Sequence, residues 1–298
     1  MFGFDTIIFI LLSATRIATP LILGALGGLF SERSGVINIA IEGMMLMGAF
    51  AAVAVSYFTG NPWLGVLGAM AAGGLFALIH AVICVTYQGN QTISGTAINI
   101  MGMALTIYLM RMIFHTEGTA NINYSLPRWG IGIVRFNPIT YFAFILVGVA
   151  WFVMYKTKFG LHVRSVGEHP AAADTMGISV EKIRYYAVII SGILAGMAGA
   201  SLSIGEGSFF VRGMSGGRGF MALAIMIIGK WHPLGVVFGA FLFAIFEALQ
   251  ISIAVVVNIP SQIVQMTPYV VTLLTLVGFM GRFVAPAAIG KPYVKGGR

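Results

Sequence analysis

Long apolar stretches separated by short polar connections dominate the chain. A membrane-spanning helix needs about 20 mainly apolar residues, and most of the nine stretches are close to that length: 4–29, 36–58, 62–87, 96–114, 138–156, 184–204, 219–230, 234–257 and 267–284. The stretch 219–230 is short, which favours a tilted or half-length helix, or a re-entrant element buried in protein. The pattern predicts an all-α integral membrane bundle of about nine spans, forming one domain over 1–298.

Composition supports this interpretation and excludes a soluble domain. The 298 residues are 58% hydrophobic and 9% charged, whereas soluble domains carry about 25% charged residues. Cys84 is the one cysteine and lies in an apolar stretch, so the sequence indicates neither a disulfide nor a thiolate metal site. The first 20 residues lack a basic region, which predicts a retained first span and not a cleaved signal peptide.

The basic residues predict an orientation in the membrane, because cytoplasmic loops carry an excess of Lys and Arg. One group lies between the fifth and sixth spans and consists of Lys156, Lys158, Arg164, Lys182 and Arg184. The other lies in the C-terminal tail and consists of Arg282, Lys291, Lys295 and Arg298. Placing both in the cytoplasm puts the N-terminus outside and the C-terminus inside. The outer loops then hold only Arg128, Arg135, Arg212 and Arg218.

Two stretches resemble each other. "NPWLGVLGA" opens the third span and "HPLGVVFGA" opens the eighth, and Leu64-Gly65-Val66 corresponds to Leu234-Gly235-Val236. The predicted topology gives these spans opposite directions, as in the inverted repeats of transporters. The alternative is that Pro, Gly and Val are simply common where a span begins.

Four ionisable side chains fall inside predicted spans and away from their ends, where they usually face a cavity or a partner: Arg16, Glu42, His80 and Glu247. Arg111 is near a span end and can extend its guanidinium to the interface. Asn38 and Glu42 are four residues apart, so we expect them on one helix face after a loosened helix start at Ser34-Gly35. They would line a translocation pathway. The alternative is an internal contact between helices, for example Arg16 with Glu42.

The stretch 87–99, "YQGNQTISGTAIN", is unusually polar for the entry to a span. We expect Gly89 and Gly95 to interrupt regular helix, because irregular backbone at membrane depth is tolerated where it lines a cavity. The alternative is an ordinary cytoplasmic turn. Glu247 and Gln250 share a face of the eighth span and leave the same two readings open. The candidate pathway residues are therefore Asn38, Glu42, Gln91, Thr92, Ser94, Asn99 and Glu247.

The connection 157–183 is long and polar. In "EHPAAADTMGIS", Pro170 suits a first helical turn after Glu168 or His169, the alanines favour helix, and Gly177 ends it. The pattern predicts a short, rigid helix with a face of small residues that inserts into another protein. The alternative is an amphipathic helix on lipid headgroups, but alanine provides little apolar area for that role.

Catalytic and nucleotide-binding signatures are absent from the sequence. It contains neither GxxxxGK[ST] nor HExxH. We therefore expect neither an enzyme nor a bound metal or cofactor.

The quoted motifs resemble a known family. "FGLHVRSVGEHPAAADTMGISVEKIRYYAVIISGILAGMAGA" resembles the cytoplasmic loop and following span of permease subunits of bacterial ABC importers, in the branched-chain amino acid and simple-sugar group. "SERSGVINIAIEGMMLMGAFAA" and "GFMALAIMIIGKWHPLGVVFGAFLFAI" are similar to its nucleoside branch, which is linked to basic membrane proteins. The resemblance covers about residues 10–285.

The resemblance implies a multi-pass protein of the bacterial inner membrane with the larger-importer fold. A second permease subunit, as a heterodimer, would complete the pore. A cytoplasmic ABC ATPase would hydrolyse ATP, and an extracytoplasmic binding lipoprotein would deliver a nucleoside. Asn38, Glu42 and Gly43 match the pore-side motif, and the ATPase-coupling pattern is matched by Gly160, Arg164, Gly167, Glu168, Pro170, Ala172, Ala173 and Gly177.

Three other functions compete with a nucleoside permease. A member of the same group would import a simple sugar such as ribose or galactose. An ion-coupled secondary transporter would use Glu42 or Glu247 as its proton site, but it would leave the docking loop unexplained. A structural or assembly protein of the membrane is the third.

Overall fold

The computed structural model describes residues 4–256, 270 and 285–295. Ten α-helices, two π-helical turns and four short strands occur in this part of the chain, in the order α1 (Phe4–Arg33), α2 (Ile41–Thr59), α3 (Pro62–Ala81), η1 (Val82–Thr86), α4 (Gln91–Phe114), β1 (Thr119–Asn121), β2 (Trp129–Ile131), β3 (Val134–Phe136), α5 (Pro138–Lys156), α6 (Lys158–Glu168), α7 (Pro170–Thr175), α8 (Val180–Ala200), η2 (Ser201–Gly205), β4 (Phe209–Val211), α9 (Arg218–Ile228) and α10 (Pro233–Val256).

Seven helices of the described part are long and apolar enough to cross a membrane. They correspond to predicted spans one to six and eight. The predicted stretch 219–230 forms α9, which has 11 residues. At 1.5 Å per residue α9 is about 16 Å long, roughly half of the hydrocarbon core. The ninth predicted span, 267–284, lies outside the described residues apart from Val270, so the count of nine stays a prediction.

Helix α8 is the centre of the bundle and packs against α1, α2 and α3. Glycines permit this packing, because small residues let helix backbones approach closely. A Cβ atom on Gly48 would lie 2.5 Å from the Gly196 Cα, and one on Gly73 would lie 2.2 Å from the Gly192 carbonyl oxygen. Helix α10 packs on α1 and α9, on the other side of the bundle from α3.

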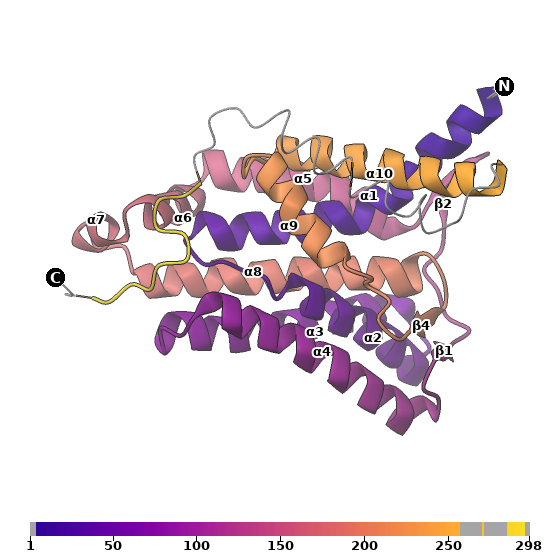
Figure 1. Cartoon of the computed structure of the whole chain (residues 1–298), viewed down its shortest axis with the longest axis horizontal. Helices are drawn as coiled ribbons and strands as arrows, with labels where there is room; N and C mark the ends of the chain where they lie inside the picture. Colours follow the sequence, from indigo (N-terminus) through magenta and orange to yellow (C-terminus); the bar gives the residue numbers. More distant parts are fainter. Residues whose placement is uncertain (1–3, 257–269, 271–284, 296–298) are drawn as a thin grey trace.

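The elements outside the long helices gather at two opposite ends (Figure 1). One end carries the start of α1 and the antiparallel pairs β1–β4 and β2–β3, which the sequence analysis did not predict. The other end carries α6, α7 and residues 285–295. Trp63, at the start of α3, contacts the ring of Trp129, so α3 begins at the end that carries the strands. Trp231, just before α10, accepts a hydrogen bond from Arg33 at the end of α1, so α10 begins at the opposite end. α3 and α10 therefore run in opposite directions, and the inverted repeat stays a prediction.

The connection between α1 and α2 is not helical. Gly35 has a φ of +91°, and the peptide groups of Ile37 bond to side chains of other helices. The Ile37 N–H donates to Gln91 Oε1 at 2.7 Å, and its carbonyl oxygen lies 2.9 Å from His80 Nε2. The predicted loosened helix start at Ser34-Gly35 is present and extends to Ala40.

Candidate functional site

Glu42, in the first turn of α2, binds the N-terminal end of α9. Its Oε1 accepts hydrogen bonds from the Ser215 hydroxyl at 2.6 Å and the Gly217 N–H at 2.8 Å. Its Oε2 accepts one from the Gly219 N–H at 2.7 Å. The first N–H groups of a helix have no partner within it and carry partial positive charge, so a carboxylate is stabilised there. Glu42 thereby joins α2 to the half-length helix.

Asn38 is fully buried in the extended connection before α2. The prediction that Asn38 and Glu42 share one helix face is therefore wrong, because α2 begins only at Ile41. The Asn38 Nδ2 donates to the Ser191 hydroxyl of α8 at 2.8 Å. Its Oδ1 has no hydrogen-bond partner among the described residues.

The polar residues at the start of α4 mostly bind the α1–α2 connection. Gln91 holds Ile37, and the Ser94 hydroxyl lies 2.9 Å from His80 Nδ1. Asn99 Oδ1 accepts from the Gly43 N–H at 2.8 Å. Thr92 is exposed. These side chains serve as interhelical contacts, and the pathway role predicted for them stays a prediction.

Gly89 and Gly95 have different environments. Gly89 lies in the connection before α4, as the prediction of irregular backbone requires. Gly95 lies inside regular α4, so for this residue the prediction is wrong. A Cβ atom at Gly95 would come within 3.1 Å of the Ala40 nitrogen, so Gly95 is needed for close helix approach and not for unwinding.

Glu247 of α10 forms an ion pair with Arg218, the first residue of α9, at 2.9 Å. Arg218 also lines a pocket of about 230 Å³ with Ser13, Arg16, Ile17, Pro20, Leu202 and Glu206. The pocket combines two guanidinium groups and a carboxylate with apolar side chains. Convergent polar groups in a mainly apolar pocket are typical of small-molecule sites.

Sequence reasoning did not assign Glu206 or Arg218 to a site. Both lie at span ends, where charged side chains are common and carry little signal by themselves. Glu206 Oε1 accepts a hydrogen bond from Asn137 Nδ2 at 3.0 Å. The Arg16 Nη2 donates to the Arg135 carbonyl oxygen at 3.3 Å, so the alternative pairing of Arg16 with Glu42 is wrong: the two carboxylate oxygens of Glu42 bind α9 and its entry.

The predicted docking loop forms two helices. Thr157 caps α6 through Gly160 N–H, and His169 is the residue before α7, with Pro170 in its first turn. Gly177 has a φ of +79°. The Ile178 N–H bonds to the Ala173 carbonyl at 3.1 Å, closing the helix end.

The eight predicted coupling residues divide into outward-facing and inward-facing ones. Ala172 and Gly177 are exposed, and Pro170 is half-buried. Ala173 is 4% exposed and packs into the core, so the outward face of small residues on α7 does not include it. A Cβ atom on Gly160 or Gly167 would lie about 2 Å from a backbone oxygen, 2.1 Å and 2.0 Å respectively, so these glycines pack α6 against Val153 and Arg33.

The other two coupling residues attach α6 to its neighbours. The Arg164 guanidinium lies over the Tyr155 ring, 5.0 Å from its centre. Glu168 Oε2 accepts a hydrogen bond from the Ala287 N–H at 3.3 Å. These contacts make α6 part of the bundle end, while α7 projects from it (Figure 1).

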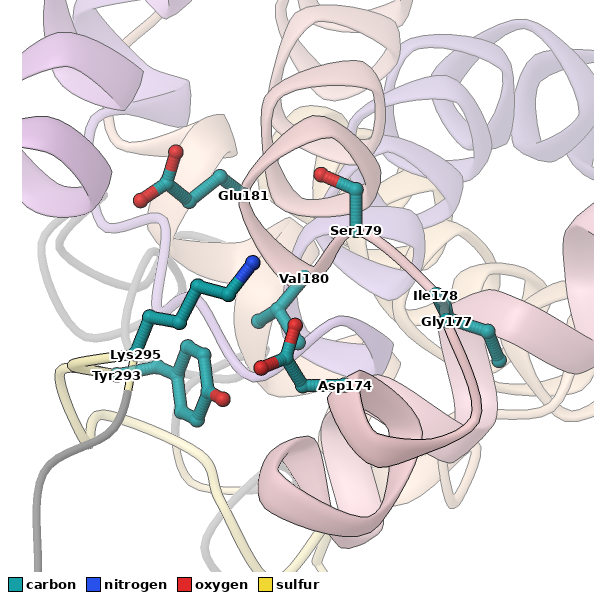
Figure 2. Close-up of a pocket in the computed structure, with 8 residues that line it drawn as sticks. All are labelled: Asp174, Gly177, Ile178, Ser179, Val180, Glu181, Tyr293 and Lys295. Carbon is teal, nitrogen blue, oxygen red and sulfur yellow. The ribbon is translucent and has the colours of Figure 1, made fainter.

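Beside α7 is a polar pocket of about 210 Å³, lined by α7, the start of α8 and the C-terminal segment. Figure 2 shows Asp174, Tyr293 and Lys295 converging on it. Desolvation and a hydrogen bond to the Asp174 carboxylate raise the pKa of Tyr293. The pocket thus joins the projecting helix to the end of the chain.

Among the described residues, no group of three or more His, Cys, Asp or Glu side chains could hold a metal ion.

Comparison with known proteins identifies the family. Residues 10–280 match the family model "Branched-chain amino acid transport system / permease component". The guanosine ABC transporter permease protein NupQ of Bacillus subtilis (strain 168) is 42% identical, over 98% of this chain and 98% of that protein. The nucleoside ABC transporter permease protein NupC of Lactococcus lactis subsp. cremoris (strain MG1363) is 38% identical, over 93% and 94%.

A sugar permease is also similar. The putative glucose ABC transporter permease protein TsgC13 of Haloferax volcanii is 41% identical, over 81% of this chain and 77% of that protein. The Bacillus and Lactococcus strains each have a second similar permease, NupP and NupB, at 28% and 24% identity.

The family match over residues 10–280 and the seven long apolar helices among the described residues lead to one conclusion. This chain is a multi-pass protein of the cell membrane that belongs to the permease components of branched-chain amino acid transport systems, within the ABC transporters.

Proposed function

We propose that this chain is the permease subunit of an ATP-driven importer of nucleosides. The observation that carries the proposal is the identity of 42% and 38% to a guanosine and a nucleoside permease over nearly the whole chain. The resemblance to a glucose permease covers less of both proteins, so a simple-sugar importer is the second candidate. The chain forms half of the translocation pore and leaves ATP hydrolysis to a partner.

The pocket between α1, η2 and α9 suits a nucleoside in chemical terms. Arg16 and Arg218 offer donors for the carbonyl oxygens of a base, and the Glu206 carboxylate offers an acceptor for ring N–H groups or ribose hydroxyls. Pro20 and Leu202 provide apolar surface for the flat base. A nucleobase is planar and carries ring N–H and carbonyl groups, whereas a sugar ring is puckered and carries only hydroxyl groups and ring oxygen, so the pocket favours the nucleoside.

The carboxylates proposed as proton sites of a secondary transporter are already engaged. Glu42 binds α9 through both oxygens, and Glu247 pairs with Arg218. This arrangement favours a pore half whose motion is driven by a partner. We infer that a second permease subunit completes the pore, as the NupP and NupQ pair suggests. We also infer a cytoplasmic ATPase that binds α7 and an external binding protein.

The ATPase contact is assigned to α6–α7 on the basis of its projecting shape and turn chemistry. Ala172, Met176 and Gly177 form the exposed tip, and Pro170 fixes its first turn. The inward-facing members of the coupling pattern position this tip. The set is Gly160, Arg164, Gly167, Glu168, Pro170, Ala172, Ala173 and Gly177.

Uptake of radiolabelled nucleosides by the complete complex in proteoliposomes tests the proposal. Guanosine uptake that needs ATP and is not competed by glucose or ribose is the expected result. Arg16→Gln should raise KM for the nucleoside, while Arg212→Gln, just after β4 at the same end and outside the pocket lining, is the matched control. ATP-dependent uptake of glucose without uptake of any nucleoside would establish the sugar alternative.

A further inference from the structure

The segment 285–291, here called the C-terminal strap, holds together three parts of the chain that are far apart in sequence. The Ala288 N–H donates to the Gly167 carbonyl of α6 at 2.9 Å. The Gly290 N–H donates to the Gly35 carbonyl at 3.0 Å. The strap therefore lies directly between the docking helices and the α1–α2 connection.

Arg184 of α8 fixes this junction from the inside of the bundle. It is 1% exposed. Its Nε donates to the Ser34 carbonyl at 3.3 Å, and its Nη1 donates to the Lys291 carbonyl at 3.1 Å. One guanidinium thus bonds to the backbone of both the α1–α2 connection and the strap, in a fork geometry that an ammonium group does not reproduce.

The contacts continue from the strap to the pore-side motif. A Cβ atom on Gly290 would lie 2.9 Å from Ile37 Cδ1, so the strap is packed against the residue before Asn38. Asn38 reaches α8 through Ser191. At the other end, Tyr293 follows the strap and lies with Asp174 of α7 in the lining of the same pocket (Figure 2).

The same junction has incompletely satisfied polar groups. Four buried side-chain atoms of the described residues lack a hydrogen-bond partner, and three of them belong to Asn38, Gln91 and Arg184. All three residues touch the stretch 34–38 or belong to it. An unsatisfied buried polar group destabilises a structure by about 1–3 kcal/mol, so the contacts of this stretch with α8 and the strap are the ones that a displacement would change first.

We propose that the C-terminal strap and Arg184 form the element that transmits displacement of α6–α7 to the stretch 34–38. The proposal rests on the proposed function, because it assigns a driving ATPase to α7. Arg184 and the strap are positioning elements and do not touch substrate. The strap and α6 move as one body, and the stretch 34–38 moves with them.

Measuring transported nucleoside per ATP hydrolysed in the reconstituted complex tests this transmission. Ala287→Pro removes the N–H that donates to Glu168. The Ile289 N–H donates to the Pro286 carbonyl oxygen, so Ala287 is the second residue of a turn, a position that suits proline. The exposed control Ala287→Ser keeps that N–H. We expect Ala287→Pro and Arg184→Lys to keep ATPase association and basal hydrolysis while transport per ATP falls about three- to tenfold. Ala287→Ser should match wild type.

A cross-link provides the complementary test. Glu168→Cys with Ala287→Cys, in a Cys84→Ala background, is joined by a short bismaleimide reagent. Because the strap and α6 move together, the cross-linked complex should keep wild-type transport. Loss of transport on cross-linking would overturn the proposal, and so would a normal ratio of transported nucleoside to hydrolysed ATP in Ala287→Pro. If a point variant fails to assemble, the cross-linked complex alone provides the test. A wild-type complex that imports no nucleoside would instead refute the proposed function.

Discussion

The Glu42 carboxylate accepts a hydrogen bond from the Gly219 N–H at 2.7 Å, and so ties the start of a full-length span to the start of a half-length helix. Glu42 comes 177 residues before Gly219 in the chain. A negative side chain therefore serves as the helix cap that α9 lacks in its own sequence, since its first residues are preceded by Gly216-Gly217.

Replacing Glu42 should separate these two helices. Glu42→Gln keeps the size but turns an NH₂ donor toward the N–H groups of Gly217 or Gly219. Hydrogen bonds to a charged group contribute about 1.5–3 kcal/mol, so we expect uptake to fall about tenfold or more. Co-purification of the partner subunits should persist. Normal uptake by Glu42→Gln and Glu42→Ala would show that the contact is dispensable for transport.

Close glycine contacts should make the helix packing sensitive to a single methyl group. Gly48→Ala places a Cβ 2.5 Å from the Gly196 Cα, a backbone atom that cannot move aside. Overpacking of this kind destabilises by about 1–3 kcal/mol. Thermal unfolding of the purified protein should show a lower transition temperature. Gly148→Ala is the matched control in α5, because its Cβ meets nothing within 4 Å, and it should unfold at or above the wild-type temperature.

Two neighbouring alanines of α7 should respond differently. Ala172 is exposed, so Ala172→Glu should weaken ATPase association about five- to a hundredfold and leave the permease stable. Ala173 is 4% exposed, so Ala173→Trp should destabilise the loop itself. Pull-down of the ATPase and protease resistance of the loop separate these effects. Thr119→Glu adds the same charge at the opposite end, and if it impaired association equally, the α7 contact would be refuted.

The start of α10 should make stability depend on pH. The His232 Nδ1 accepts the Leu234 N–H at 3.2 Å, which requires the unprotonated nitrogen. Burial and the nearby Arg33 lower the pKa of His232. The unfolded chain, with a histidine pKa of about 6.5, binds this proton more readily, so stability falls as pH drops below about 6.5 toward the lowered value.

His232→Asn tests this dependence, because asparagine also caps a helix but does not titrate. Unfolding temperatures between about pH 5 and 8 should show a smaller decrease at acidic pH in this variant than in wild type. Identical pH profiles would exclude His232 as the source.

The predicted orientation can be tested at the two ends of the bundle. Ile133 in the β2–β3 turn is 75% exposed, and Met176 after α7 is 81% exposed. In a Cys84→Ala background, an impermeant thiol reagent on intact cells should label Ile133→Cys. Met176→Cys should react only after permeabilisation. The reverse pattern would invert the topology and place α7 outside the cytoplasm.

Hydropathy alone predicted spans one to six and eight, because the free energy of placing a side chain in lipid depends mainly on that side chain. The shortness of the seventh stretch left a tilted helix, a half-length helix and a re-entrant element open, and the 11 residues of α9 fit the half-length helix. Local chemistry also placed α7, since Pro170 and Gly177 set its two ends through their own backbone preferences.

Tertiary structure decided the partners of the polar groups. Glu42 was visible in the sequence as a group that needs a partner, but its partners Ser215, Gly217 and Gly219 are more than 170 residues away. Asn38 does not lie on the predicted helix face, because the peptide groups of Ile37 bond to side chains of α3 and α4 and keep this stretch out of a helix. Which side chains meet across a bundle depends on how helices distant in sequence cross. The spacing of residues along the chain predicts which side chains share a helix face, but it does not predict those crossings.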